Sequence, residues 1–258
     1  MRVALNQCPS PSGATGPDTP NGGLATLDAS LSAARAAGAG ALVMPELFLP
    51  GYNTPDPGAQ ARAAAEWDAE LGPRAARAGV GLIIGLAERE GAALYNSAMA
   101  WGPDGARLAQ YRKTQLFGPR EKTLFTPGTR LVTFALGPRK AALLICYDIE
   151  FAPLCAQLAA EGVELVLVPT ANMLPFTHVS RLTVPSQAVN HGLAIVYANY
   201  CGSEGDLSYA GGSLIVNRDG AVLAQAGPGP ALLVADLDHP VDPALLSTQG
   251  ADYRPVTL

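Results

Sequence analysis

The sequence lacks the residues and patterns on which several common classes of site depend. It has three histidines and four cysteines in 258 residues, and no histidine lies near a cysteine in a metal-ligand spacing. This spacing does not fit a zinc site. Basic residues number 17 against 22 acidic ones, and they form no run. Without a basic stripe, neither nucleic acid nor an anionic membrane surface is an expected partner.

Long hydrophobic runs are also missing. The longest apolar segments, such as VGLIIGLA, are far too short to span a bilayer. The apolar stretch in MRVALNQCPSP is too short for a signal peptide. The cysteines form no CxxC pair, so in a protein without an export signal they are expected to be free thiols. We therefore expect a cytoplasmic protein.

What is present is a series of short apolar strands that alternate with helical patterns. In the first half, the strand RVALNQC is followed by a Pro/Gly-rich loop to Gly23, and helices are predicted for residues 24–38 and 59–78. The other predicted strands are ALVMPE, VGLIIGLAE and ALYNSAMAW. The turn PDG at residues 103–105 joins the last of these to ARLAQYR as a hairpin.

The second half repeats this order of elements. KAALLIC, ELVLVP and LAIVYAN are predicted strands, residues 150–162 and 178–191 are predicted helices, and GGSLIVNRDGAVLAQ is a hairpin similar to SAMAWGPDGARLAQ. Such internal similarity predicts two halves related by a pseudo-twofold axis. Each half needs helices to cover one face of its sheet. The predicted fold class is therefore α/β, a four-layer α-β-β-α sandwich of two pseudo-symmetric halves. We assign residues 1–238 to this domain and 239–258 to a C-terminal tail that packs on the domain or on a partner subunit.

Among the cysteines, only Cys146 lies between a buried strand and the start of a helix. Unpaired backbone N–H groups at a helix start lower the pKa of a thiol and stabilise an oxyanion. Cys8 precedes a loop, Cys155 lies in an apolar helical pattern, and Cys201 enters a polar loop. Taken alone, Cys146 has a plain alternative interpretation as a buried core thiol.

Two charged residues follow other predicted strands. Glu46 comes directly after ALVMP, and Lys113 follows the hairpin strand and begins a loop of about fifteen residues that also contains Glu121. A surface glutamate and a solvated lysine are the ordinary interpretations of such residues. Together with a thiol, however, they fit one reaction. A carboxylate deprotonates the thiol, an ammonium neutralises the oxyanion, and the thiolate forms a thioester.

Three segments in this order, MPELFLPGY, YRKTQLF and ICYDIEF, resemble the Glu, Lys and Cys motifs of the nitrilase superfamily, the carbon–nitrogen hydrolases. NSAMAWGPDG and IVYANYCG fit as well, and the resemblance extends to about residue 237. It implies the αββα sandwich. It also implies that Glu46 is the general base, Cys146 the nucleophile and Lys113 the group that stabilises the intermediate. Glu121 matches the second glutamate, which supports Lys113.

The resemblance further implies the surroundings of the substrate. The backbone N–H of Tyr147 is expected to join Lys113 in the oxyanion site, and Tyr52, Asn172 and nearby loop residues are expected to border the substrate. No metal or organic cofactor is implied. The chain departs from the common pattern where QAVNHG replaces a RAxEN motif on a helix. That departure concerns the oligomer contact and part of the pocket wall, and it leaves the catalytic set intact.

Within the superfamily, the short chain and the CYD sequence resemble the amidase branches. We therefore predict hydrolysis of a small-molecule carboxamide to an acid and ammonia by a homodimer or larger even oligomer. A nitrilase, an N-carbamoyl hydrolase and an acyl transferase are the enzymatic alternatives. A non-catalytic sandwich that binds small molecules is the alternative from another class.

The two acidic residues behind the thiol receive different roles. Asp148 is expected to cap the helix that starts after Cys146, because its carboxylate can accept a bond from an unpaired N–H. Superfamily members that cleave amides of dicarboxylic acids resemble the sequence CYDIRF at the nucleophile. Glu150 occupies the position of the arginine in that sequence. A carboxylate there should repel an anionic substrate and favour neutral or cationic amides. The alternative is that Glu150 points into solvent or pairs within the protein.

Overall fold

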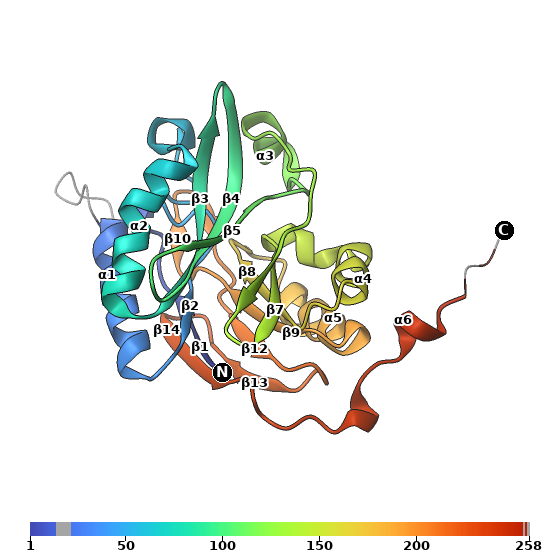
Figure 1. Cartoon of the computed structure of the whole chain (residues 1–258). Coiled ribbons are helices and arrows are strands. Elements are labelled where there is room, and N and C mark those ends of the chain that lie inside the picture. Colours follow the sequence, from blue (N-terminus) through green and yellow to red (C-terminus); the bar gives the residue numbers. More distant parts are fainter. Residues whose placement is uncertain (14–21, 255, 257–258) are drawn as a thin grey trace.

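The protein is described by a computed structural model that covers residues 1–13, 22–254 and 256. Most of the predicted Pro/Gly-rich loop before Gly23 lies outside the described residues, as do three positions of the predicted tail. Two six-stranded mixed sheets form the centre of the molecule (Figure 1).

The first sheet has the strand order β14-β1-β2-β3-β4-β5. Its central strands β1, β2 and β3 are parallel, and the remaining neighbours are antiparallel. The strands are β1 (Arg2–Gln7), β2 (Ala41–Val43), β3 (Gly81–Glu90), β4 (Ala93–Trp101), β5 (Arg107–Arg112) and β14 (Ala231–Asp236).

The second sheet repeats this pattern in the order β6-β7-β8-β9-β12-β13. Here β7, β8 and β9 are parallel and the outer pairs are antiparallel. The strands are β6 (Thr133–Leu136), β7 (Arg139–Leu143), β8 (Leu165–Pro169), β9 (Ala194–Ala198), β12 (Leu214–Val216) and β13 (Val222–Gln225). A separate two-stranded hairpin joins β10 (Ser203–Glu204) and β11 (Leu207–Ser208). The matching orders confirm the two pseudo-symmetric halves.

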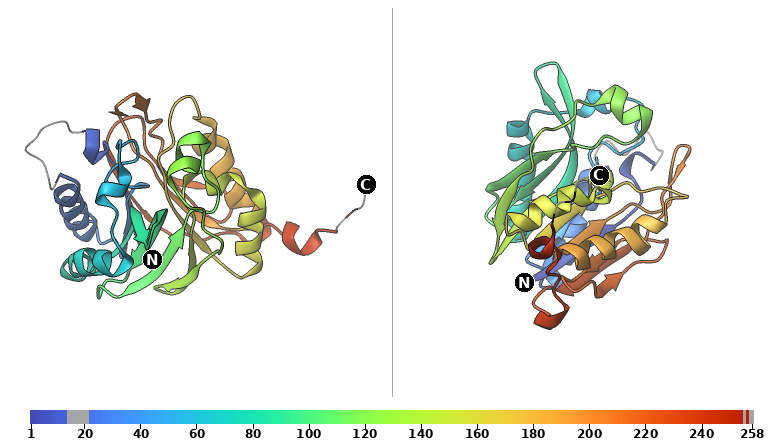
Figure 2. Two further views of the ribbon diagram at one scale, coloured as in Figure 1. Left: turned by 90° about the horizontal axis from the view of Figure 1, so that it is seen from above. Right: turned by 90° about the vertical axis from the view of Figure 1, so that its right-hand side faces the viewer.

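Helices cover the outer face of each sheet, so four layers stack as α-β-β-α (Figure 2, left). α1 (Gly22–Ala36) and α2 (Ala64–Ala78) lie on the first sheet, whereas α4 (Ala152–Ala160) and α5 (Val184–His191) lie on the second. The predicted fold class is confirmed. Short helical turns η1 (Pro11–Gly13), η2 (Pro57–Gln60), η3 (Cys146–Glu150) and η4 (Val179–Thr183) connect these elements.

The central strands β2, β8 and β9 are apolar and buried along their whole length, because both faces of each sheet are covered there. In β1, Val3 and Leu5 face the core between the two sheets, while Ala4 packs against the helices of the first half. In β3, Ile83 faces the core between the sheets, and its neighbours Leu82 and Ile84 face the helices. This alternation is the period of two of a β-strand.

Sequence reasoning placed some boundaries differently from the structure. The loop predicted after Lys113 contains the helix α3 (Gly118–Leu124). The helix predicted for residues 59–78 begins at Ala64, because Glu66 accepts a hydrogen bond from the Ala63 N–H at 2.8 Å and fixes the start there. The last strand, β14, pairs with β1 and completes the sheet of the first half.

After β14 the chain leaves the sandwich. The turn η5 (Pro243–Leu245) and the short helix α6 (Gln249–Asp252) contain no buried residue, and α6 touches α4 and α5. Figure 1 shows this segment running away from the body of the molecule. In the part of the chain that the structure describes, no helix is both long and apolar enough to cross a bilayer.

Candidate active site

Glu46 stands in the turn that follows β2, and its side chain is fully buried. The turn passes so close to β3 that a Cβ atom on Gly85 would lie 2.5 Å from the Cα of Glu46, so only glycine fits there. The backbone N–H of Glu46 donates to the carbonyl of Thr170, which follows β8, at 3.3 Å. The carboxylate is thereby placed where the ends of the two sheets meet.

Lys113 lies one residue beyond β5 and is also buried. Its backbone N–H donates to the carbonyl of Asn96 at 2.8 Å, and its carbonyl accepts from the N–H of Gly128 at 2.8 Å. A Cβ atom on Gly128 would lie 2.1 Å from the carbonyl oxygen of Arg112, so the close approach of this loop requires glycine. The lysine is thus held by backbone contacts on both sides.

Cys146 is the first residue of the turn η3. Residues 144–145 connect it to the end of the strand β7. The backbone of Cys146 has a left-handed conformation with φ 46°, which is uncommon for a residue with a side chain. Such a turn places the thiol at the head of the strand rather than within the sheet. Cys146 is partly exposed, whereas the other three cysteines are buried.

Five buried side chains form one connected network beside the thiol. The ammonium of Lys113 donates to Glu46 Oε1 at 2.7 Å and to Glu121 Oε1 at 2.8 Å. The Tyr52 hydroxyl donates to Glu121 Oε1 at 2.7 Å, and Asn96 donates to Glu46 Oε1 at 2.7 Å. Within the described residues, Glu46 Oε2 has no hydrogen-bond partner. That oxygen is free to exchange a proton with a neighbouring group.

The network shifts the pKa of Glu46 and that of Lys113. Burial raises the pKa of Glu46 to about 7, against the opposing effect of Lys113, and Glu121 raises it further. Burial opposes the charge on Lys113, but Glu46 and Glu121 outweigh it and raise the pKa of the lysine well above its usual value. At neutral pH the site therefore holds a cationic lysine beside a carboxyl group that is ready to gain or lose a proton.

The thiol of Cys146 differs from the sequence-based expectation. We expected the helix start to lower its pKa, but burial and the charge of Glu46 raise it, against smaller opposing effects of Lys113 and Thr170. A raised pKa favours the neutral form of the Cys146 thiol. The thiol needs a base to become a nucleophile, and Glu46 is the base that the structure places beside it.

A cavity of about 260 Å³ opens onto the thiol. Its wall contains all four residues that the sequence analysis expected to border the substrate, namely Tyr52, Tyr147, Glu150 and Asn172. Three aromatic rings form a continuous edge-to-face series along this wall, with 5.3 Å between the centres of Phe117 and Tyr147 and 5.8 Å between those of Phe117 and Phe176. The volume lies just below the range of roughly 300–1,000 Å³ typical of sites for drug-sized ligands. The cavity suits a small, partly apolar molecule.

The polar residues of this wall differ in their availability. Asn172 donates to the carbonyl of Phe176 at 2.9 Å, so its amide fixes the loop at the cavity mouth. Glu150 is partly exposed and makes no hydrogen bond or ion pair within the described residues. Burial raises its pKa, and the nearby His178 and Lys113 oppose that effect. The structure thus places an unpaired carboxylate in the wall, rather than in a pair within the protein.

Asp148 does not cap α4, the helix for which we expected it, but it takes part in the capping box of η3, the helical turn that starts at Cys146. The residue that precedes α4 is Phe151, which makes no side-chain cap. The Asp148 carboxylate instead points back and accepts hydrogen bonds from the N–H groups of Ile145 and Gln115. The expectation failed because those donors precede Asp148 in the chain, one of them by 33 residues.

Sequence reasoning also missed residues of the site. Asn96, which fixes Glu46, begins the segment NSAMAWGPDG that fits the family, and a buried amide in an apolar strand needs partners. Phe117, Phe176 and His178 line the cavity but come from loops whose course could not be predicted.

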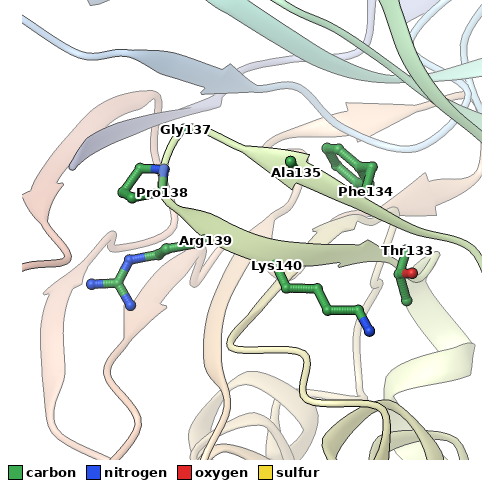
Figure 3. A pocket seen from close by; sticks show the side chains of 7 residues that line it. All are labelled: Thr133, Phe134, Ala135, Gly137, Pro138, Arg139 and Lys140. Atoms are coloured by element: carbon green, nitrogen blue, oxygen red, sulfur yellow. The ribbon is translucent and has the colours of Figure 1, made fainter.

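A second hollow, of about 290 Å³, lies on the β6–β7 hairpin away from these residues (Figure 3). One hairpin alone lines it. Of its two cationic side chains, Arg139 already donates to the carbonyl of Leu237 at 2.8 Å and pairs with Asp238 at 3.0 Å. Arg139 therefore fastens the chain after β14 to the hairpin. The hollow lacks the converging buried polar groups that mark the cavity at Cys146. Across the described residues, no group of three or more His, Cys, Asp or Glu side chains is arranged to hold a metal ion.

Comparison with known proteins agrees with this geometry. A protein of Pseudomonas protegens described as a hydrolase in the pqqF 5′ region is 38% identical and aligns with 99% of this chain and 90% of its own length. An (R)-stereoselective amidase of a Pseudomonas species is 37% identical, over 67% of this chain and 62% of that protein.

Solved structures give the same result. An amidase from Nesterenkonia sp. AN1 superposes with a TM-score of 0.87 at 36% identity, and the match covers 98% of this chain and 96% of that one. In another structure of that amidase, acrylamide has added to the active-site cysteine. The family model for carbon–nitrogen hydrolases matches residues 2–242. The chain therefore belongs to the carbon–nitrogen hydrolases of the nitrilase superfamily, in their amidase-like branch.

Proposed function

We propose that this carbon–nitrogen hydrolase is an amidase that converts a small neutral or cationic carboxamide to an acid and ammonia through a thioester on Cys146. One observation carries the proposal. Lys113 bridges Glu46 and Glu121 at 2.7 and 2.8 Å in a buried network beside a partly exposed thiol that lines a cavity. A protein that only binds small molecules gains nothing from burying this set of charges, which is costly unless they are used.

In the first half of the reaction, Glu46 takes the proton from the Cys146 thiol as the sulfur attacks the carbonyl carbon of the amide. The carbonyl oxygen becomes an oxyanion, which the Lys113 ammonium and the backbone N–H of Tyr147 stabilise. Glu46 then gives its proton to the amide nitrogen. The C–N bond breaks, ammonia leaves, and the acyl group remains on sulfur as a thioester.

In the second half, Glu46 takes a proton from water as the water oxygen attacks the thioester carbon. The same oxyanion contacts serve again. The C–S bond breaks, sulfur recovers the proton from Glu46, and the carboxylic acid is released. A carboxyl group with a pKa of about 7 is suited to take and return protons at neutral pH, because neither form is strongly favoured. Glu121 and Tyr52 hold Lys113 in position throughout.

Glu150 and the cavity size limit the substrate. The unpaired carboxylate in the cavity wall repels a second negative charge, while the aromatic wall accepts an apolar or cationic group. We therefore infer neutral or cationic amides such as amino-acid amides. A nitrile or an N-carbamoyl compound could use the same Glu46, Lys113 and Cys146. The amidase names among the similar proteins support an amide as the substrate.

We further propose that residues 1–238 act as one catalytic domain in a cytoplasmic homodimer or larger even oligomer. The segment after β14 supports an oligomer, because η5 and α6 bury no residue and leave Leu245 and Tyr253 58% and 73% exposed. Although α6 touches α4 and α5, apolar side chains that stay exposed on this segment are suited to pack on a partner subunit. Residues 239–258 would then be a tail that reaches across.

The proposed activity is tested by incubating the protein with a panel of carboxamides, nitriles and N-carbamoyl compounds and measuring ammonia and acid together. We expect equal amounts of ammonia and acid from small carboxamides, and an acyl adduct on the Cys146 peptide in mass spectra of acid-quenched reactions. The matched control is Cys146→Ala. Turnover of nitriles or N-carbamoyl compounds without any turnover of carboxamides would contradict the assignment.

A further inference from the structure

The buried carboxylate of Asp148 lies between the two segments that carry the reactive groups. It sits in η3, two residues after the nucleophile, and is fully buried. Oδ2 accepts from the Ile145 N–H at 3.0 Å and from the Tyr111 hydroxyl at 2.9 Å. Oδ1 accepts from the Gln115 N–H at 2.8 Å and from the Thr114 hydroxyl at 3.0 Å. A single side chain thus receives four hydrogen bonds.

The donors come from both sides of the site. Ile145 directly precedes Cys146 in the second half of the molecule. Tyr111, Thr114 and Gln115 surround Lys113 at the end of β5 in the first half. Among the described residues, every hydrogen bond between residues 111–115 and residues 145–148 ends on the carboxylate of Asp148. The carboxylate therefore ties the lysine segment to the nucleophile turn across the two sheets.

The chemistry of the contacts requires a carboxylate. Two of the donors are backbone N–H groups, one on each oxygen, and they cannot turn away or accept a bond. An amide in place of the carboxylate would point an NH₂ group at one of these N–H groups, whichever way it flipped. The left-handed conformation of Cys146, with φ 46°, also needs surrounding contacts that hold it. The bond from Ile145 to Asp148 closes this turn.

We propose that Asp148 is a positioning residue for the proposed amidase reaction: by tying the two segments together, it sets the distance between the Lys113 ammonium and the Cys146 sulfur. It does not touch the substrate, and it acts through these two residues. A displacement of about 1 Å between catalytic groups is enough to cost a factor of about 100 in rate. Loss of the tie should therefore lower kcat much more than it changes KM.

The first test is Asp148→Asn, with Glu88→Gln as the matched control. Like Asp148, Glu88 has a buried carboxylate, but it lies on β3 in the first sheet. It accepts hydrogen bonds from Gln110 at 2.7 Å and from Arg112 at 3.0 Å. Because side chains alternate along a strand, Arg112 points to the opposite face from Lys113. Both variants lose a buried charge and break a network. Only Asp148→Asn breaks the tie between the two segments.

We expect Asp148→Asn to lower kcat by about 100-fold, with KM changed by less than about threefold. Alkylation of Cys146 by iodoacetamide at pH 7 should also slow by about tenfold or more, since the thiol loses its alignment with the base. Glu88→Gln should lower the melting temperature while kcat stays within about threefold of the wild type. A purely structural role predicts that both variants lose stability and that neither loses kcat per folded molecule.

A second variant covers the case in which Asp148→Asn does not fold. Tyr111→Phe combined with Thr114→Val removes the two hydroxyl donors and leaves the carboxylate and both N–H contacts in place. We expect a loss of about tenfold in kcat, because the tie is weakened and not broken. Full kcat in this double variant, or in folded Asp148→Asn, would overturn the proposal, as would an equal loss in Glu88→Gln. The alkylation rates need no amide, so they test Asp148 even if the wild type hydrolyses none.

Discussion

Replacing Glu150 by glutamine should change which substrate charge the protein accepts. In the wild type this carboxylate lines the cavity beside Cys146 without a partner among the described residues. Glu150→Gln keeps the size of the side chain and removes the charge. We expect kcat/KM to rise for an ω-amide that carries a free carboxylate, to stay constant for a neutral aliphatic amide, and to fall for a cationic amino-acid amide.

The size of the change follows from the position of the charge. Two unit charges about 6 Å apart interact with roughly 2.8 kcal/mol at an effective dielectric constant near 20. Glu150 is partly exposed, and water at the cavity mouth screens the interaction. Doubling the effective dielectric constant leaves about 1.4 kcal/mol. The ratio of kcat/KM for the anionic amide to that for the neutral amide should therefore rise by about 10-fold to 100-fold.

The assay compares the three amides at pH 7.5 in the wild type, in Glu150→Gln and in a control, Glu161→Gln. Glu161 is exposed at the end of α4 and does not line the cavity, so its replacement changes the net charge equally without altering the site. Burial raises the pKa of Glu150, so acidification neutralises it earlier than a free glutamate. In the wild type, discrimination against the anionic amide should weaken as the pH falls, and in Glu150→Gln it should not. Unchanged ratios in Glu150→Gln, or a wild type that prefers the anionic amide, would refute the reasoning.

Three further predictions concern the catalytic set and the assembly. Cys146→Ala should abolish amide hydrolysis, while alanine at each of the other three cysteines should leave most of the activity. If Cys146→Ala kept more than about a tenth of the activity, less than about 1.4 kcal/mol of the activation barrier would depend on the thiol. Glu46→Gln and Lys113→Gln should each lower kcat by about 100-fold or more. In the wild type, kcat/KM should rise with pH through a midpoint near 7, where Glu46 ionises. A wild-type profile that is flat between pH 5.5 and 8.5 would exclude Glu46 as the base. Light scattering at micromolar concentration should give at least twice the mass of one chain, and truncation after residue 238 should shift the protein towards the monomer. A stable full-length monomer would argue against a tail that reaches across.

The sequence allowed the fold and the three central residues to be predicted because their signals are local. Glu46, Lys113 and Cys146 each follow an apolar strand and lie in a distinctive motif. The internal repeat predicted two equivalent sheets, and the structure has them. These signals depend on residues that are near one another in the chain, which is where patterns of apolar and polar residues are informative.

The remaining features depend on contacts between distant residues. We expected Asp148 to cap a helix. Its contacts with residues 111–115 could not be predicted, because those donors are more than thirty positions away in the chain. The helix α3 is only seven residues long, and Glu121 in it is fixed by Lys113 and by the Phe117 N–H at 2.9 Å. A helix this short has little stability of its own. β14 returns to pair with β1 near the opposite end of the sequence, which no local pattern indicates.

The two halves of the molecule give different chemistry to equivalent positions. β2 is the third strand of the first sheet, counted from β14, and β8 is the third strand of the second sheet, counted from β6. The chain after β2 leads to Glu46, and the chain after β8 leads to Thr170. The backbones of these two residues are joined by the hydrogen bond at 3.3 Å. β1 and β7 are likewise equivalent and lead to Cys8 and Cys146. Cys8 is buried, and burial together with the nearby Cys201 raises its pKa to about 12. Unlike Cys146, it does not line the cavity.

The reactive groups are therefore divided between the halves, with the base and the lysine on the first sheet and the nucleophile on the second. Neither half holds a complete catalytic set, so the chemistry exists only where the two sheets pack. The contacts between Lys113 and Glu46 lie within the first half and cannot place the sulfur. The hydrogen bonds that Asp148 accepts from Tyr111, Thr114 and Gln115 cross from one half to the other at this point. A site assembled from two halves needs such a tie, and this is why we expect a residue that never touches the substrate to govern the rate.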